Sequence, residues 1–163
     1  MVLEIMDSYY VATAMSKANY VKIFFNLEHN GNGYPPVDVE SLWAVDLKNG
    51  TYRLENVPFY ATAVSLKDIV RVRQENGRLN FLEIIAPSGN STIRVIMFDK
   101  EQTQTVRDEF TLIGCSTELS NIKSFFSVDV PLDVNYEIVL ELLARYSKLG
   151  QLDFEESALR HLR

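Results

Sequence analysis

The stretch SLWAVDLKNGTYRL, residues 41–54, decides the fold of the first half of the chain. Its two ends are rich in β-branched and aromatic residues, which favour extended strands. Between them, Asn49-Gly50 supplies the positive φ angles that a tight hairpin turn requires. The stretch therefore predicts an antiparallel hairpin with strands at 41–47 and 51–54.

Further strand signals lie on both sides of this hairpin. The run YVKIFFNL at 20–27 is β-rich, and the Asn, Gly and Pro residues of 28–36 then indicate a long loop. A second hairpin is predicted at 68–85, with its turn at Asn76-Gly77. The first half is therefore expected to be mainly antiparallel sheet.

The second half mixes strands with helices. Strands are predicted at 92–98 and 124–130, and between them Asp99 and Gln102 form a capping-box-like start to a helix that ends before Gly114. The strongest helix signal opens at 131–133 and closes at Gly150.

The second predicted helix carries an apolar stripe at four-residue spacing, with its charged residues elsewhere. The residues expected in the stripe are Val134, Ile138, Leu142 and Tyr146, and Val139 and Leu143 are expected to widen it. Glu141 and Arg145 are expected to pair along the exposed face.

These elements predict the α+β class: N-terminal antiparallel hairpins forming a curled sheet or half-barrel, then a ferredoxin-like sheet with two helices on one face. Residues 1–19 are expected to form an N-terminal arm or short helix. Residues 20–163 are expected to form a single compact domain, or two lobes with 20–86 mainly β and 87–163 α+β.

The charge balance disfavours two classes of partner. Sixteen Lys and Arg against 22 Asp and Glu leave a net charge of -6 in 163 residues, so we expect no binding to nucleic acid or to an anionic membrane. The lone Cys115 forbids an internal disulfide, and no basic, apolar export signal opens the chain. A cytoplasmic location is expected.

Residues suited to catalysis are few. Nucleophilic catalysis commonly needs a histidine base, and only His29 and His161 are present. Both are expected to be ordinary surface residues, and Cys115 is expected to be a structural, partly buried thiol. We therefore predict no catalytic residues, no metal and no cofactor, and a protein that is not an enzyme.

One segment keeps an alternative open. The turn-rich segment 87–94 could hold an anion, although it lacks the full phosphate-loop pattern. The candidate anion-binding residues are Ser88, Asn90, Ser91 and Arg94. The alternative function is an enzyme, or a small-molecule or nucleotide-sensing regulator, that uses this loop.

Residues suited to binding a protein come from three places. Asp153, Glu155 and Glu156 form an acidic cluster that could dock a basic partner. Trp43 is expected in the core; if exposed beside Tyr34, it would instead be an interface anchor. These five residues are the candidate partner contacts.

Four segments carry a family resemblance: GYPPV at 33–37, ESLWA at 40–44, NVPF at 56–59 and PSGNSTIRV at 87–95. In this order they resemble a bacterial family known as domain of unknown function four-two-six-five, over about residues 20–157. The resemblance implies one fold and a bacterial origin, and it brings no catalytic residues.

Small acidic bacterial α+β proteins of this kind also resemble immunity proteins, which bind and block a toxin made by the same cell. The expected function is therefore a protein-binding module, most concretely an immunity protein that neutralises a cognate toxin. The negative charge implies that the toxin is basic.

Overall fold

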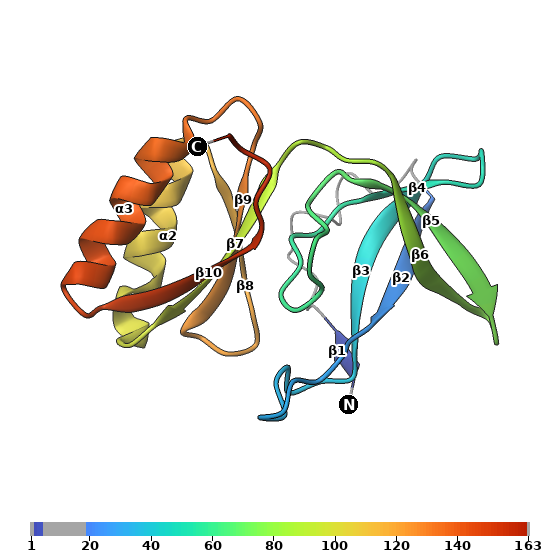
Figure 1. Cartoon of the computed structure of the whole chain (residues 1–163), viewed down its shortest axis with the longest axis horizontal. Helices are drawn as coiled ribbons and strands as arrows, with labels where there is room; N and C mark the ends of the chain where they lie inside the picture. Colours follow the sequence, from blue (N-terminus) through green and yellow to red (C-terminus); the bar gives the residue numbers. More distant parts are fainter. Residues whose placement is uncertain (1, 5–18, 163) are drawn as a thin grey trace.

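The computed structural model describes residues 2–4 and 19–162, which form two lobes side by side (Figure 1). Each lobe is built on its own sheet, and the chain passes from the first to the second between Ala86 and Ser91. Most of the segment expected to be an arm or short helix lies outside the described residues. Within it, Val2–Glu4 forms strand β1.

The first lobe is a closed barrel. Its strands are β2 (Tyr20–Asn26), β3 (Val39–Asp46), β4 (Tyr52–Leu54), β5 (Ile69–Glu75) and β6 (Arg78–Ala86). They follow the order β3-β2-β6-β5-β4, and a further β3–β4 pairing closes the circle, while β1 runs parallel to the first residues of β3 and pairs with them. The expected curled sheet is confirmed, and it closes further than a half-barrel.

Both predicted hairpins are confirmed. In the first, Ala44 pairs with Leu54 and Asp46 with Tyr52; in the second, Glu75 pairs with Arg78 across the turn. Because successive strand residues face opposite sides, Leu42 and Ala44 fill the barrel.

Trp43 corrects one expectation. It lies between two core residues of β3, so its side chain faces out of the barrel and is half-buried rather than part of the core. The Lys22 ammonium lies 5.0 Å from the centre of its ring, a cation–π contact.

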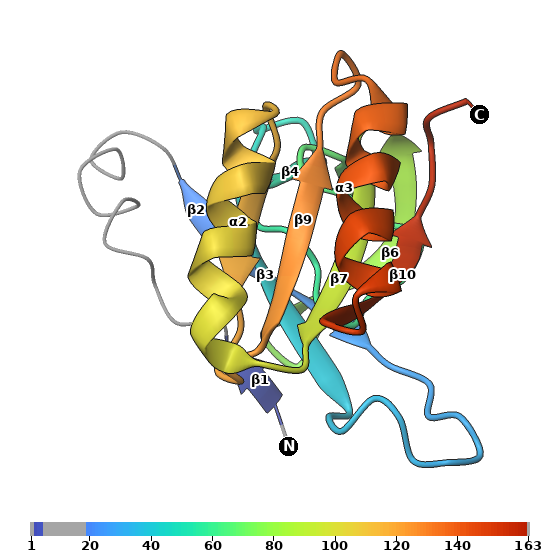
Figure 2. The same cartoon turned by 90° about the vertical axis from the view of Figure 1, so that its left-hand side faces the viewer.

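The second lobe has the predicted ferredoxin-like arrangement. Its elements are β7 (Ser91–Met97), the 3-10 turn η1 (Lys100–Gln102), α2 (Thr103–Leu112), β8 (Ser116–Leu119), β9 (Phe125–Val130), α3 (Tyr136–Lys148) and β10 (Leu152–Ala158). The strands follow the order β10-β7-β9-β8, all antiparallel. Both helices cover one face of this sheet (Figure 2).

Helix α3 begins later than predicted, and its predicted stripe is confirmed except at Ile138. Asn135 caps it by accepting a hydrogen bond from the Glu137 N–H, so the helix starts after Val134. Val139, Leu142 and Leu143 are buried as expected, Val134 and Tyr146 are partly buried against the same core, and Tyr136 is buried in addition. Ile138 is 46% exposed, because the strict four-residue spacing drifts around a helix of 3.6 residues per turn.

The predicted pairing of Arg145 is also corrected. Arg145 bonds the carboxylate of Glu109 on α2, so this charge ties the two helices together instead of pairing with Glu141 along its own helix.

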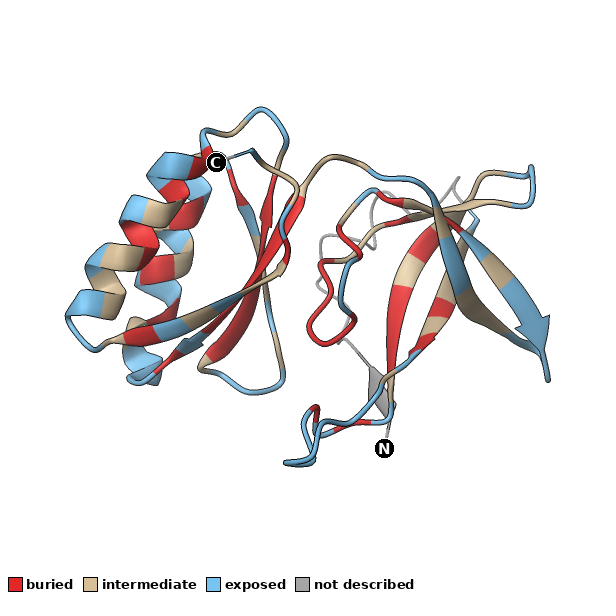
Figure 3. Cartoon of the chain, viewed as in Figure 1, coloured by how far each residue is buried: buried red, intermediate tan, exposed pale blue. Residues whose placement is uncertain are grey.

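The two faces of the second sheet differ in polarity, which prepares the site. Ile93, Val95 and Val128 face the helices and join their core. The alternate residues Arg94 and Ser127, paired across β7 and β9, face the barrel. Buried residues therefore lie in the core of each lobe and also where the lobes face each other (Figure 3), and the buried residues there include polar ones such as Arg94 and Ser127.

Candidate functional site

The loop between β4 and β5, residues 55–68, fills the space between the lobes and is called here the interlobe loop (Figure 1). Glu40 on β3 holds it from the barrel side. Its fully buried carboxylate accepts hydrogen bonds from the N–H groups of Phe59 at 2.6 Å, Tyr60 at 2.9 Å and Ala61 at 2.6 Å. Burial raises the pKa of Glu40, and the three donors oppose that rise.

Arg94 holds the same peptides from the second lobe. Its Nη2 donates to the carbonyl oxygens of Tyr60 at 2.8 Å and Ala61 at 3.1 Å, and its Nη1 donates to Glu155 at 3.3 Å. The Arg94 side chain is only 4% exposed, and its Nε has no hydrogen-bond partner within the described part of the chain. The loop is thus fixed at Tyr60 by an acid on one side and a base on the other.

A second carboxylate anchors the start of the loop. Glu118 on β8 accepts hydrogen bonds from the Val57 N–H at 2.9 Å and from the Asn56 side chain at 3.2 Å. Asn56 in turn accepts from the Trp43 N–H. Burial raises the pKa of Glu118 to about 7.

The C-terminal residue Arg160 clamps the two lobes, and His161 docks the same segment onto the second lobe. Arg160 donates to both carboxylate oxygens of the fully buried Asp68, at 2.5 and 2.7 Å. His161 stacks on Tyr136, and its Nδ1 lies 2.7 Å from Ser91 Oγ. The expectation that His161 is an ordinary surface residue is wrong, because its ring is packed and hydrogen-bonded.

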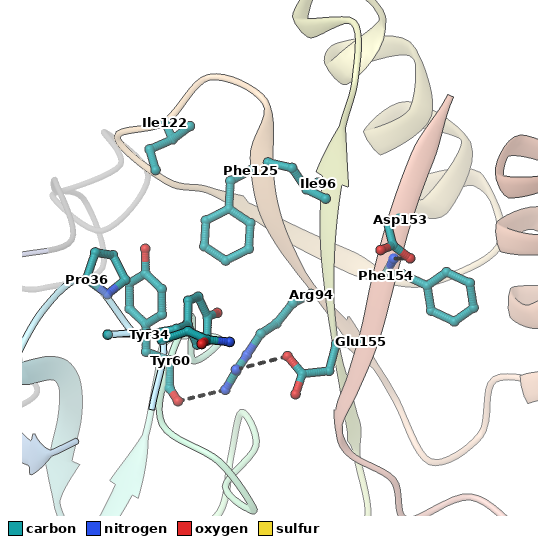
Figure 4. Close-up of a pocket in the computed structure, with 12 residues that line it drawn as sticks. Tyr34, Pro36, Tyr60, Arg94, Ile96, Ile122, Phe125, Asp153, Phe154 and Glu155 are labelled. Carbon is teal, nitrogen blue, oxygen red and sulfur yellow. Dashed lines mark hydrogen bonds and ion pairs between the residues drawn. The ribbon is translucent and has the colours of Figure 1, made fainter. Parts of the chain in front are cut away.

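Beside the interlobe loop opens a cleft of about 520 Å³ (Figure 4). Residues of both lobes line it, among them Tyr34, Tyr60, Arg94, Ile96, Ile122, Phe125, Asp153 and Glu155. A second hollow, of about 450 Å³, continues across the lobes and shares Tyr34, Tyr60, Arg94 and Glu155 with the first.

The aromatic side of the cleft comes from three separated segments. Tyr34 and Tyr60 meet edge to face with ring centres 5.9 Å apart, and Phe125 lies 5.7 Å from Tyr60. Tyr34 is 42% exposed, so its ring is open to a visiting molecule. Burial raises the pKa of both tyrosines, so their hydroxyls stay neutral.

The acidic side of the cleft belongs to β10. Asp153 and Glu155, two residues apart, lie on the face toward the barrel. Glu156 lies on the opposite face, where its carboxylate accepts a hydrogen bond from the Tyr136 hydroxyl at 2.7 Å. The acidic cluster seen in the sequence is thus divided between two faces of the sheet.

The structure brings three of the five candidate partner contacts together: Tyr34, Asp153 and Glu155 line the cleft. Trp43 and Glu156 do not line it. The cleft also contains Tyr60 and Phe125, which sequence reasoning missed. Their signal was the apolar character of NVPFY and SFFSV, which is typical of any core segment.

The structure does not bring the four candidate anion-binding residues together at one site. The N–H of Ser88 donates to Asp68, Asn90 donates to Asp129 at 2.9 Å, and Ser91 Oγ accepts from the Arg160 N–H. Only Arg94 reaches the cleft.

Two further sequence expectations concern ligating residues. Cys115 is a free, buried thiol as expected, and burial raises its pKa to about 12. His29 lies in an exposed loop, with its Nε2 2.9 Å from Asp38. Among residues 2–4 and 19–162, no group of three or more His, Cys, Asp or Glu side chains is placed to hold a metal ion.

The model of the family described as "Domain of unknown function (DUF4265)" matches residues 40–154. The chain belongs to this family. The DUF4265 match starts at β3 and ends within β10, so it spans both lobes and is shorter than the expected 20–157. It includes Glu40, Arg94 and Asp153, while Tyr34 and Glu155 lie just beyond its ends.

A solved structure shares the fold. The crystal structure titled as that of a hypothetical protein from Neisseria gonorrhoeae is 22% identical to this DUF4265 chain, with a TM-score of 0.71. The similarity covers 86% of this chain and 96% of that one, and at this identity it shows the fold alone. No curated protein matches the chain. Within the described part of the chain, no helix is long and apolar enough to cross a membrane.

Proposed function

We propose that this protein is a stoichiometric binding protein whose cleft receives a segment of a basic partner protein, most concretely an immunity protein that neutralises a cognate bacterial toxin. The observation that carries the proposal is the convergence of Tyr34, Asp153 and Glu155 on one cleft of about 520 Å³. Aromatic anchors beside charged groups are typical of binding hot spots.

The size and rigidity of the cleft support binding. Its volume falls in the range of about 300–1,000 Å³ that is common for ligand sites. The Tyr60 peptide is fixed by Glu40 and Arg94, so this wall of the cleft is held before any partner arrives. A preformed site loses less conformational entropy on binding.

Charge supports a basic partner. The chain carries a net charge of -6, and the rim of the cleft adds the carboxylates of Asp153 and Glu155. Such a field speeds the encounter with a positively charged protein. The proposed place of action is the bacterial cytoplasm, where the single thiol of Cys115 stays reduced.

Co-purification from the cells that make the protein tests this proposal. The tagged chain is isolated at low and then at high salt, and proteins retained in a one-to-one ratio are identified by mass spectrometry. The identified partner is then expressed with and without this chain. A basic partner that kills cells only when this chain is absent is the expected result, and equal killing in both cases would contradict it.

A second candidate function is small-molecule binding, in a regulator or an enzyme. The observation that favours it is Arg94, which lines both hollows with its buried Nε unpaired among the described residues. Thermal melts with nucleotides and metabolites test it, since a ligand at one hundred times its dissociation constant adds about 2.7 kcal/mol to stability. Unchanged melts would remove this candidate.

A further inference from the structure

We infer that the cleft recognises one arginine or lysine side chain, presented on a peptide segment of the partner, with its charged head at Asp153 and Glu155. This inference rests on the proposed function and adds to it the chemistry of the group that is recognised.

The two carboxylates have unused binding capacity. Asp153 makes no ion pair within the described chain, and its side-chain hydrogen bond there is local: it accepts from the adjacent Phe154 N–H at 2.9 Å. Glu155 makes one long contact of 3.3 Å to Arg94, and its side chain is 60% exposed. Two carboxylates on one strand face can therefore share an incoming cation, which a guanidinium binds with paired N–H donors.

The remaining walls suit the stem of a long basic side chain. Ile96, paired opposite Asp153, is 38% exposed, and Ile122 is 46% exposed. Together with Phe125 they offer apolar surface to the methylene groups of arginine or lysine, which bury their stems and keep the head in polar surroundings. Tyr34 and Tyr60 add ring faces within the same cleft, to which a cation is attracted.

The extent of the hollow explains why the ligand is a peptide segment and not a free cation alone. The cleft of about 520 Å³ continues into the second hollow of about 450 Å³, and the two share Tyr34, Tyr60, Arg94 and Glu155. An extended segment can therefore occupy both hollows while one basic side chain reaches Asp153 and Glu155. The Arg94 charge does not repel the ligand strongly, because the two carboxylates of Asp153 and Glu155 outnumber it on this face of the sheet.

Nuclear magnetic resonance titration of the whole protein tests this inference. The probe is N-acetyl-arginine methylamide, and the matched control is N-acetyl-citrulline methylamide, which has nearly the same shape without the charge. The backbone signals of Arg94, Ile96, Asp153 and Glu155 should move with the arginine probe. The citrulline probe should bind about tenfold more weakly.

Two double variants complete the test. Asp153→Asn with Glu155→Gln should weaken the arginine probe by about tenfold, whereas Glu75→Gln with Glu83→Gln, which removes the same charge from the exposed β5–β6 hairpin, should leave it unchanged. Equal binding of both probes, or no shifts near the cleft up to tens of millimolar, overturns the inference. A toxin partner that is still captured and neutralised in that case leaves the proposed function standing.

Discussion

Replacing Arg160 should destabilise the protein strongly, although it lies three residues from the end of the sequence. Asp68 is 0% exposed, and Arg160 is its only ion-pair partner in the described chain. Removing one member of a buried pair leaves a buried charge, which typically costs about 3–5 kcal/mol. Asp68 keeps the N–H donors of Ser65 and Ser88, and the Arg160 side chain is 17% exposed, so Arg160→Ala should cost about 3 kcal/mol.

Thermal and urea unfolding measure this loss. For a chain of this size, about 3 kcal/mol corresponds to a fall of about 6–12 °C in Tm. The matched control is Arg71→Ala, because Arg71 pairs with Glu83 on the surface and both side chains are about half exposed. It should lower stability by less than about 1 kcal/mol.

A double-mutant cycle makes the reasoning refutable. Asp68→Asn removes the buried charge, so adding Arg160→Ala to it should cost much less than Arg160→Ala alone. If Arg160→Ala were no worse than Arg71→Ala, or if the two changes at Asp68 and Arg160 were simply additive, the clamp would not hold the lobes as described.

Three further predictions concern buried groups. Glu40→Gln should lower the free energy of unfolding in urea by about 3 kcal/mol, because the amide NH₂ would face backbone N–H donors. The control Glu75→Gln should change this free energy little. Burial raises the pKa of Glu118 to about 7 and that of Asp129 to about 6, so their contribution to stability is fully present below the pKa values of the unfolded chain and is lost as the pH rises toward 8. The free energy of unfolding should therefore fall between pH 5 and pH 8, by at most about 1.4 kcal/mol per pH unit for each group. Glu118→Gln should make this fall shallower. Cys115 should react with a thiol reagent at pH 8 only after unfolding, since burial raises its pKa to about 12; fast labelling of the folded protein would contradict its buried position.

The parts of the fold that depend on local signals could be predicted from the sequence. The Asn49-Gly50 and Asn76-Gly77 turns fix their hairpins within a few residues, and Gly150 ends α3 as expected. In the predicted α3 stripe only Ile138 was misplaced, because the four-residue spacing was extended through it, and the cap at Asn135 sets the true start of the helix.

The strands β8 and β10 were missed because polar residues interrupt their apolar ones, so neither segment has the apolar run of a typical strand. In β10, Asp153 and Glu155 alternate with apolar or helix-facing residues, a pattern that resembles a solvated acidic segment when read alone. The segment becomes a strand because Leu152 and Phe154 pack on the core of the second lobe and the backbone pairs with β7, while Asp153 and Glu155 stay exposed at the cleft.

The candidate site could be predicted only in part. Tyr34, Asp153 and Glu155 stand out by residue type, so sequence reasoning found them without knowing that they meet. Glu40 and Tyr60 did not stand out, because their roles depend on contacts between residues 20 or more positions apart. A lone acidic residue within the apolar strand VESLWAV was the available signal for Glu40.

The central claim is that the acidic, aromatic cleft is where a basic partner protein binds. The most direct test compares the amount of partner retained, at one salt concentration, by the wild type, by Asp153→Asn with Glu155→Gln, and by the charge-matched control Glu75→Gln with Glu83→Gln. We predict that the cleft variant loses most of the partner and its protection against killing, while the control keeps both. Equal retention by all three proteins would contradict the account.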